Sequence, residues 1–129
     1  VYKTDQGEMV RSKSELIIAN ILYKNREMLK YKYERPLEVM IEGYTQTIYP
    51  DFTILNVRTG KLVYWEHAGR MDDPRYAANF VKKINTYIDN GIIPGKNLIV
   101  TYETVNSPIV IQHIQLQIEI LKQNMMIFP

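Results

Sequence analysis

The chain has 129 residues, 46% of them apolar and 23% charged, which excludes a disordered, collagen-like or low-complexity protein. It contains no cysteine and only two histidines, which excludes disulfides, thiolate zinc sites and cysteine nucleophiles. The net charge of +2 does not by itself indicate a nucleic-acid partner. We therefore expect one domain over residues 1–129, in which any metal ion is held mainly by oxygen atoms.

The apolar runs of the sequence are short. None approaches the roughly 18 consecutive apolar residues that a membrane span requires. The chain also opens without a charged segment followed by an apolar leader. We expect a soluble, cytoplasmic protein with no membrane partner.

The charges are distributed unevenly along the chain. Residues 11–35 hold seven Lys/Arg and three acids, whereas residues 36–73 hold three Lys/Arg and six acids. A basic flank beside an acidic centre is typical of a phosphate-binding surface around a cation site, although solvated faces give the same pattern.

The first half of the chain begins with a helix signal. Ser12 followed by Glu15 is typical of a capping box, and apolar residues at three- and four-residue spacing predict a helix over 12–28. Alternation around Pro36 predicts an irregular or edge strand over 31–41.

A hairpin is expected next. The β-branched and aromatic stretch 47–55, the turn residues 56–60 and the apolar stretch 61–67 predict two antiparallel strands.

The second half alternates helix and strand signals. Asp73-Pro74 and Asn90-Gly91 delimit a second helix, and 98–102 is a compact apolar strand. The segment after Ser107-Pro108 alternates like a strand but starts like a helix, and we interpret it as a helix. The expected order is helix, three strands, helix, strand, helix, an α/β fold whose strand–helix–strand unit joins parallel neighbours through a right-handed crossover.

Three acidic residues lie at positions where burying a carboxylate costs free energy. Asp51 opens the first hairpin strand, Glu66 lies within the apolar second strand, and Glu15 lies on the apolar face of the first helix. Two carboxylates on neighbouring strands can share Mg²⁺ or Mn²⁺. The structural alternatives are a capping box with an Arg11 pair for Glu15, a turn cap for Asp51, and an Arg70 pair for Glu66.

This ordered set resembles the PD-(D/E)XK nuclease superfamily. The resemblance covers about residues 11–103 and depends on Glu15, Pro50-Asp51 and Glu66 in an α-β-β-β-α-β context. It implies a restriction-endonuclease-like core and a metal-dependent nuclease acting on DNA, in which Asp51 and Glu66 bind the metal and Glu15 assists.

The sequence departs from that pattern at one position. The superfamily has lysine two residues after the second acid, and here that residue is Ala68. Lys83, four residues before Tyr87, resembles the Gln-x-x-x-Tyr element of some members and is our first replacement, with a solvated helix face as the alternative. His67 is the second, since it turns inward only if the strand bends at Gly69; a hydrogen-bonded core histidine is the alternative.

Five residues are candidates for contact with nucleic acid. Arg11, Lys13 and Ser14 at the first helix can bind phosphate through side chains and free amides, and Arg70 and Lys82 add charge near the site. A capped, solvated helix has the same pattern.

Two functions follow from these residues. The first is a magnesium-dependent DNA nuclease, and the second is a nuclease-like domain that has lost catalysis and binds nucleic acid or a protein. The sequence leaves open DNA against RNA, endonuclease against exonuclease, and whether the chain forms a homodimer.

Overall fold

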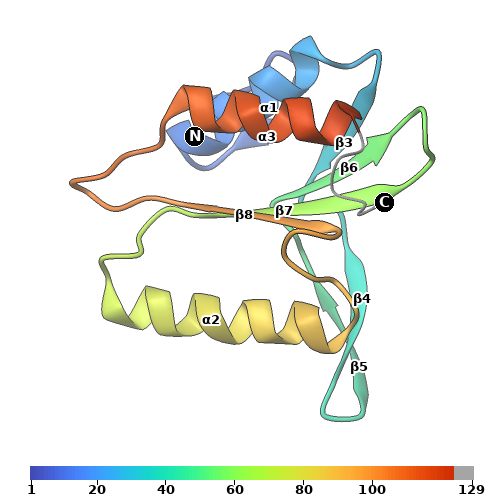
Figure 1. The fold of residues 1–129 in the computed structure, drawn as a ribbon. Helices are drawn as coiled ribbons and strands as arrows, with labels where there is room; N and C mark the ends of the chain where they lie inside the picture. The colour runs from blue at the N-terminus through green and yellow to red at the C-terminus, as the bar shows by residue number, and fades with distance from the viewer. Residues whose placement is uncertain (124–129) are drawn as a thin grey trace.

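The structure is a computed structural model that describes residues 1–123; the last six residues of the predicted domain, 124–129, lie outside it. The described residues form a small α/β protein with three helices and a mixed sheet (Figure 1). The helices are α1 (Lys13–Lys24), α2 (Pro74–Asp89) and α3 (Ile111–Gln123). The strands are β1 (Tyr2–Lys3), β2 (Met9–Val10), β3 (Leu29–Tyr33), β4 (Leu37–Ile41), β5 (Tyr44–Ile48), β6 (Phe52–Asn56), β7 (Leu62–Ala68) and β8 (Leu98–Tyr102).

The main sheet has four strands in the order β3-β6-β7-β8. The pairs β3/β6 and β6/β7 are antiparallel, and β7 pairs with β8 in parallel, as the strand–helix–strand unit predicts. The predicted hairpin is β6 and β7, joined through residues 57–61, one position later than the expected turn at 56–60.

The segment before this hairpin differs from the prediction. The single strand predicted over 31–41 is two strands, because Glu34 adopts a positive φ of 51° and Pro36 has no amide proton for a ladder. The strand predicted over 47–55 is likewise divided, since Pro50 separates β5 from β6. Together β4 and β5 form an additional hairpin, which turns at Glu42 and Gly43, both with positive φ.

The helix signals locate the helix starts well. Ser12 and Glu15 form both hydrogen bonds of the capping box, and Asp73 caps α2 through the amides of Arg75 and Tyr76. The first helix ends at Lys24 rather than near residue 28, because β3 begins at Leu29. The last helix begins at residue 111, later than the Ser107-Pro108 signal, although it is a helix as predicted.

The helices cover both faces of the sheet. Figure 1 shows α1 and α3 on one side and α2 on the other, with the β4–β5 hairpin extending on the α2 side. The larger core lies between the sheet and α1/α3 and includes the fully buried Trp65 and Phe52. A smaller core lies under α2 around Tyr87 and Leu98. Among residues 1–123, no helix combines the length and apolarity that crossing a membrane requires.

Candidate active site

Asp51 and Glu66 lie side by side at one end of the β6–β7 pair. The register sets Phe52 opposite Trp65, so the next position along β6 toward its start sets Asp51 opposite Glu66. The Asp51 amide donates to Glu66 Oε2 at 3.2 Å. The predicted juxtaposition of these two acids therefore follows directly from the strand pairing.

Glu66 is buried and receives two side-chain donors from α2. Lys83 Nζ is 2.8 Å from Glu66 Oε1, and Tyr87 donates its hydroxyl to Oε2 at 2.6 Å. Glu66 is only 2% exposed, so both contacts replace lost water. The alternative pair with Arg70 is not formed, because that guanidinium bonds Asp73.

The Asp51 carboxyl lies where a negative charge is unfavourable. Burial and the charge of Glu66 raise the pKa of Asp51 from 3.8 to about 8, against the opposing effects of the His67 amide and of Lys83. That amide donates to Asp51 Oδ2 at 2.8 Å. A carboxyl group in this environment favours either a proton or a cation close to neutral pH.

Lys83 is held in its charged form. Burial alone lowers the pKa of a lysine, but the charge of Glu66 and the hydrogen bond to it outweigh burial and raise the pKa of Lys83. Burial, followed by the charge of Glu66, raises the pKa of Tyr87. Both groups therefore keep their protons at neutral pH and act as donors.

Glu15 is turned toward its own helix start. Its Oε1 accepts from the amides of Arg11 and Ser12 at 3.1 Å each and from the Tyr33 hydroxyl at 3.2 Å. The Arg11 guanidinium pairs with Glu34 and not with Glu15. The structural alternative, a complete capping box, is thus present, and Glu15 is buried as expected.

Two neighbouring pockets meet at Asp51. A pocket of about 210 Å³ also contains Glu66 and Lys83. A wider one of about 640 Å³ contains Glu15. The remaining lining residues are His67, Tyr76, Asn79 and Phe80 in the first pocket, and Arg11, Ser12, Lys13, Ser14, His67, Gly69, Arg70, Tyr76 and Glu103 in the second.

The carboxylate oxygens of Asp51 and Glu66 are ligands of the type that a divalent cation prefers. Two carboxylates on adjacent strands offer hard oxygen ligands, and the raised pKa of Asp51 marks a place where positive charge stabilises the fold. Within residues 1–123, however, no three His, Asp or Glu side chains converge closely enough to hold a metal ion together. The pair Asp51 and Glu66 therefore fits a cation, whereas the predicted third ligand, Glu15, does not join it in this conformation.

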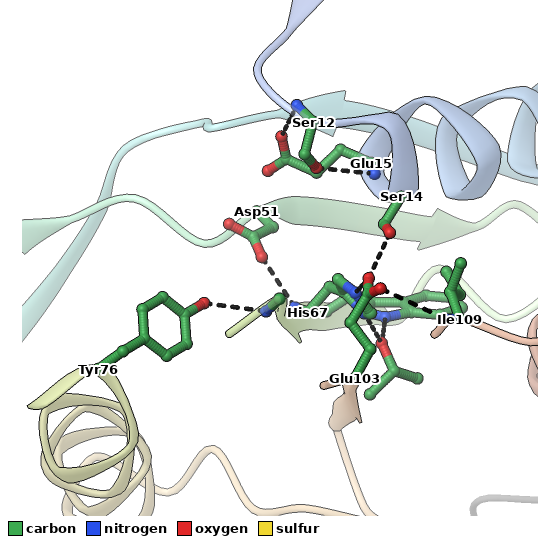
Figure 2. Close-up of polar contacts among 11 residues, drawn as sticks. Ser12, Ser14, Glu15, Asp51, His67, Tyr76, Glu103 and Ile109 are labelled. Atoms are coloured by element: carbon green, nitrogen blue, oxygen red, sulfur yellow. Dashed lines mark hydrogen bonds and ion pairs between the residues drawn. The ribbon is translucent and has the colours of Figure 1, made fainter. Parts of the chain in front are cut away.

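His67 faces away from Glu66. Its Nδ1 is 2.7 Å from Thr101 Oγ1 and its Nε2 is 2.6 Å from Glu103 Oε1, which Ser14 also bonds (Figure 2). Because the ionised Glu103 carboxylate can only accept, Nε2 is the donor to it, and Trp65 Nε1 donates to Thr101 Oγ1 at 3.0 Å. The side chain is a hydrogen-bonded histidine of the α1/α3 face. The strand β7 runs unbroken through His67 to Ala68, and the bend that follows at Gly69 does not turn the ring toward Glu66.

Glu103 joins α1 to the end of β8. Burial favours its neutral form, but hydrogen bonds from Ser14 and His67 outweigh burial and hold the pKa of Glu103 below its ordinary value. The carboxylate is therefore ionised and fixes both donors. This residue follows Thr101 at two-residue strand spacing, which is the signal that could have identified the pair.

Four of the five predicted nucleic-acid contacts share the wider pocket. Arg11, Lys13, Ser14 and Arg70 line it, whereas Lys82 lies exposed on α2 and does not.

The sequence analysis missed two residues of α2. Tyr76 and Asn79 line the smaller pocket with Lys83, and the Tyr76 hydroxyl accepts from the Gly69 amide at 3.1 Å (Figure 2). Asn79 lies four residues before Lys83, and Tyr76 lies three residues before Asn79. This spacing places all three on one helix face, and the periodicity could have revealed them.

Comparisons with models of protein families, with curated proteins and with solved structures give no match. The fold and the site define a class only: an α/β protein with a mixed sheet and two adjacent carboxyl groups at one end of the β6–β7 pair.

Proposed function

We propose that this chain is a metal-dependent nuclease with a restriction-endonuclease-like core that hydrolyses phosphodiester bonds of DNA. The observation that carries the proposal is the half-buried Asp51 beside the buried Glu66 at the paired ends of β6 and β7, with Lys83 bound to Glu66 and open to a pocket. The ordered set of acids in the sequence supports the same activity.

Asp51 and Glu66 would hold Mg²⁺ or Mn²⁺. The ion, when bound, would supply polarisation of the scissile phosphate and activation of water. Asp51 must lose its proton to bind a cation, and its pKa of about 8 places that loss near neutral pH. Glu15 remains the predicted assisting acid, since it shares the wider pocket with Asp51.

Lys83 supplies the positive charge that Ala68 lacks. Because its pKa is raised, Lys83 stays protonated and acts as a fixed cation toward the charge that develops on the phosphate. Its Nζ is anchored on Glu66 at 2.8 Å, and its side chain is 36% exposed to the solvent from which substrate arrives. We assign the role to Lys83 rather than to His67, whose imidazole lies on the other face.

The second candidate is a nuclease-like domain that binds nucleic acid or protein without cleaving. Lys83 and Tyr87 donate to both oxygens of Glu66, and this saturation favours a carboxylate kept for structure. The two functions differ in whether a metal ion displaces part of this network.

A nicking assay separates them. Supercoiled plasmid and labelled duplex DNA are incubated with protein in Mg²⁺, Mn²⁺ or EDTA. We expect metal-dependent cleavage that Asp51→Asn and Glu66→Gln each abolish while DNA binding persists. Asp89→Asn, an exposed acid at the end of α2, is the matched control and should cleave normally.

The same proteins are melted with and without Mn²⁺. At ten times the dissociation constant, the metal should stabilise the wild type by about 1.4 kcal/mol and Asp51→Asn much less. Cleavage by either variant at the wild-type rate would reject Asp51 and Glu66 as the metal site. A wild type that neither cleaves nor gains stability from Mn²⁺ would exclude the nuclease and favour the binding domain.

A further inference from the structure

A further pocket, separate from the two at Asp51, lies on the sheet face that carries Glu66. It has a volume of about 500 Å³, and we call it the lysine groove. It is lined by Lys30, Tyr31, Lys32, Arg35, Thr53, Leu55, Gly60 and Leu62. Its charged lining residues are all basic, and none of them belongs to the nucleic-acid contacts that the sequence predicts.

The face on which the lysines lie follows from strand alternation. Along β3 the buried Leu29 and Tyr31 join the core under α1 and α3, so the exposed Lys30 and Lys32 point to the opposite side. That opposite side is the α2 side, because Tyr64, in line with Lys32 across the sheet, packs in the core under α2. The lysines and Glu66 therefore share one face.

The groove and the candidate active site lie in neighbouring rows of one sheet face and share no lining residue. Lys30 stands in one row with Leu55 and Leu62, and Lys32 stands in the next row with Thr53 and Tyr64.

The third row is the site itself. There Glu34 donates its amide to the Asp51 carbonyl at 3.0 Å, and Asp51 lies opposite Glu66. Rows on one face are about 7 Å apart, so Lys32 is one row and Lys30 two rows from the carboxylate pair.

The charges of the groove are free to attract an anion. Lys30, Lys32 and Arg35 are all exposed. The acid beside Arg35 in sequence, Glu34, is paired with Arg11 instead. A row of cations along a strand, with no acid among the groove's lining residues, complements a chain of regularly spaced negative charges better than a single anion.

We infer that the lysine groove binds the phosphodiester backbone of DNA next to the bond to be cleaved. Lys30, Lys32 and Arg35 pair with successive phosphates, while Leu55 and Leu62 contact the sugars between them. These contacts fix the position of the strand and read no sequence. The choice of DNA over another polyanion rests on the proposed function; the basic surface itself does not.

The test is binding of fluorescein-labelled 20-nucleotide DNA, single-stranded and duplex, by anisotropy in EDTA over a range of salt. The double variant Lys30→Ala/Lys32→Ala should bind roughly tenfold more weakly at about 0.1 M salt. It should also lower the slope of log affinity against log salt by about 1.4 to 1.8, as two lost phosphate contacts require. Lys30→Arg/Lys32→Arg should retain binding because it retains the charge.

The matched control is Lys3→Ala/Lys24→Ala, which removes the same charge from exposed positions on β1 and α1. It should bind as the wild type does. Equal weakening by both pairs would show a general charge effect and overturn the inference, as would wild-type binding by the groove variant. Should that variant unfold, Arg35→Ala in an exposed loop gives a second test with an expected slope change of about 0.7 to 0.9.

Two combinations of results separate the groove inference from the proposed nuclease function. Loss of binding in the groove variant of a protein that never cleaves would keep the groove and reject the nuclease. Metal-dependent cleavage by the wild type, together with wild-type DNA binding by the groove variant, would keep the nuclease and reject the groove. Binding to vesicles of anionic lipid or to polyglutamate, without binding to DNA, would overturn the assigned occupant.

Discussion

Glu66 and His67 are consecutive in β7 and lie on opposite faces of the sheet, in environments that differ in kind. Glu66 faces a pocket beside a second carboxylate and a lysine, whereas His67 faces a hydrogen-bonded chain of Trp65, Thr101 and Glu103. Both are buried and both have partners. The difference is that on the α2 face the charged form of Asp51 is unfavourable, and a bound cation can relieve that cost.

The same comparison indicates which side chains stabilise the fold and which are available to a ligand. A donor that is fixed in a closed chain stabilises the fold, because each group there satisfies another. A cation at the mouth of a pocket is available to a ligand. We therefore expect chemistry from the α2 face and stability from the α1/α3 face at this end of β7.

The largest expected effect is on cleavage. Lys83→Ala should reduce the rate at saturating DNA by roughly 10² to 10⁴, since it removes the fixed cation beside the scissile phosphate. Lys82→Ala changes the exposed neighbour on the same helix and should do much less. Full activity in both lysine variants and its loss in His67→Ala would reverse the comparison and move the catalytic charge to the other face.

The next effect is on folding. His67→Ala should lower the free energy of unfolding by about 2 kcal/mol, because it leaves Thr101 and Glu103 without their shared partner. Urea denaturation measures the loss, and cleavage is expressed per folded molecule. Unchanged stability with abolished cleavage would show that His67 is not a structural group.

The smallest effect, counted over one pH unit, is the pH dependence of stability in EDTA. The folded pKa of Asp51 is raised, so its stabilisation is complete below the ordinary value of 3.8 and is lost as pH rises through about 8. Between these values Asp51 alone lowers the free energy of unfolding by up to about 1.4 kcal/mol per pH unit. Asp51→Asn should remove that part of the slope. Superimposable wild-type and variant curves from pH 5 to pH 8.5 would show that Asp51 is not held in an unfavourable charged state.

Much of the candidate site could be predicted from local pattern. Asp51 and Glu66 were identifiable because an acid in a strand signal is costly and a hairpin of known turn fixes their register. Lys83 and Tyr87 were identifiable because four-residue spacing places both on one helix face. Their contact with Glu66 confirms this placement and leaves their role to the experiments above.

Other features depended on contacts between distant segments. Glu103 meets Ser14 across 89 residues, and no periodicity relates the two. The lysine groove requires β3, β6 and β7 to pair in a given register, so that Lys30 and Lys32 align with Glu66 on one face.

The sequence by itself determined the helix caps, the β6–β7 hairpin, the parallel β7–β8 pair and the nearness of Asp51 to Glu66. The caps, the hairpin and the nearness of the two acids follow from hydrogen bonds and side-chain alternation within a few residues or across one short turn. The parallel pair follows from the strand–helix–strand crossover. Only the tertiary structure decided that Glu15 binds its own helix start, that His67 belongs to the α1/α3 face, and that burial raises the pKa of Asp51. The physical reason is that desolvation and competition between partners depend on every element packed around a group, and not on its neighbours in the chain.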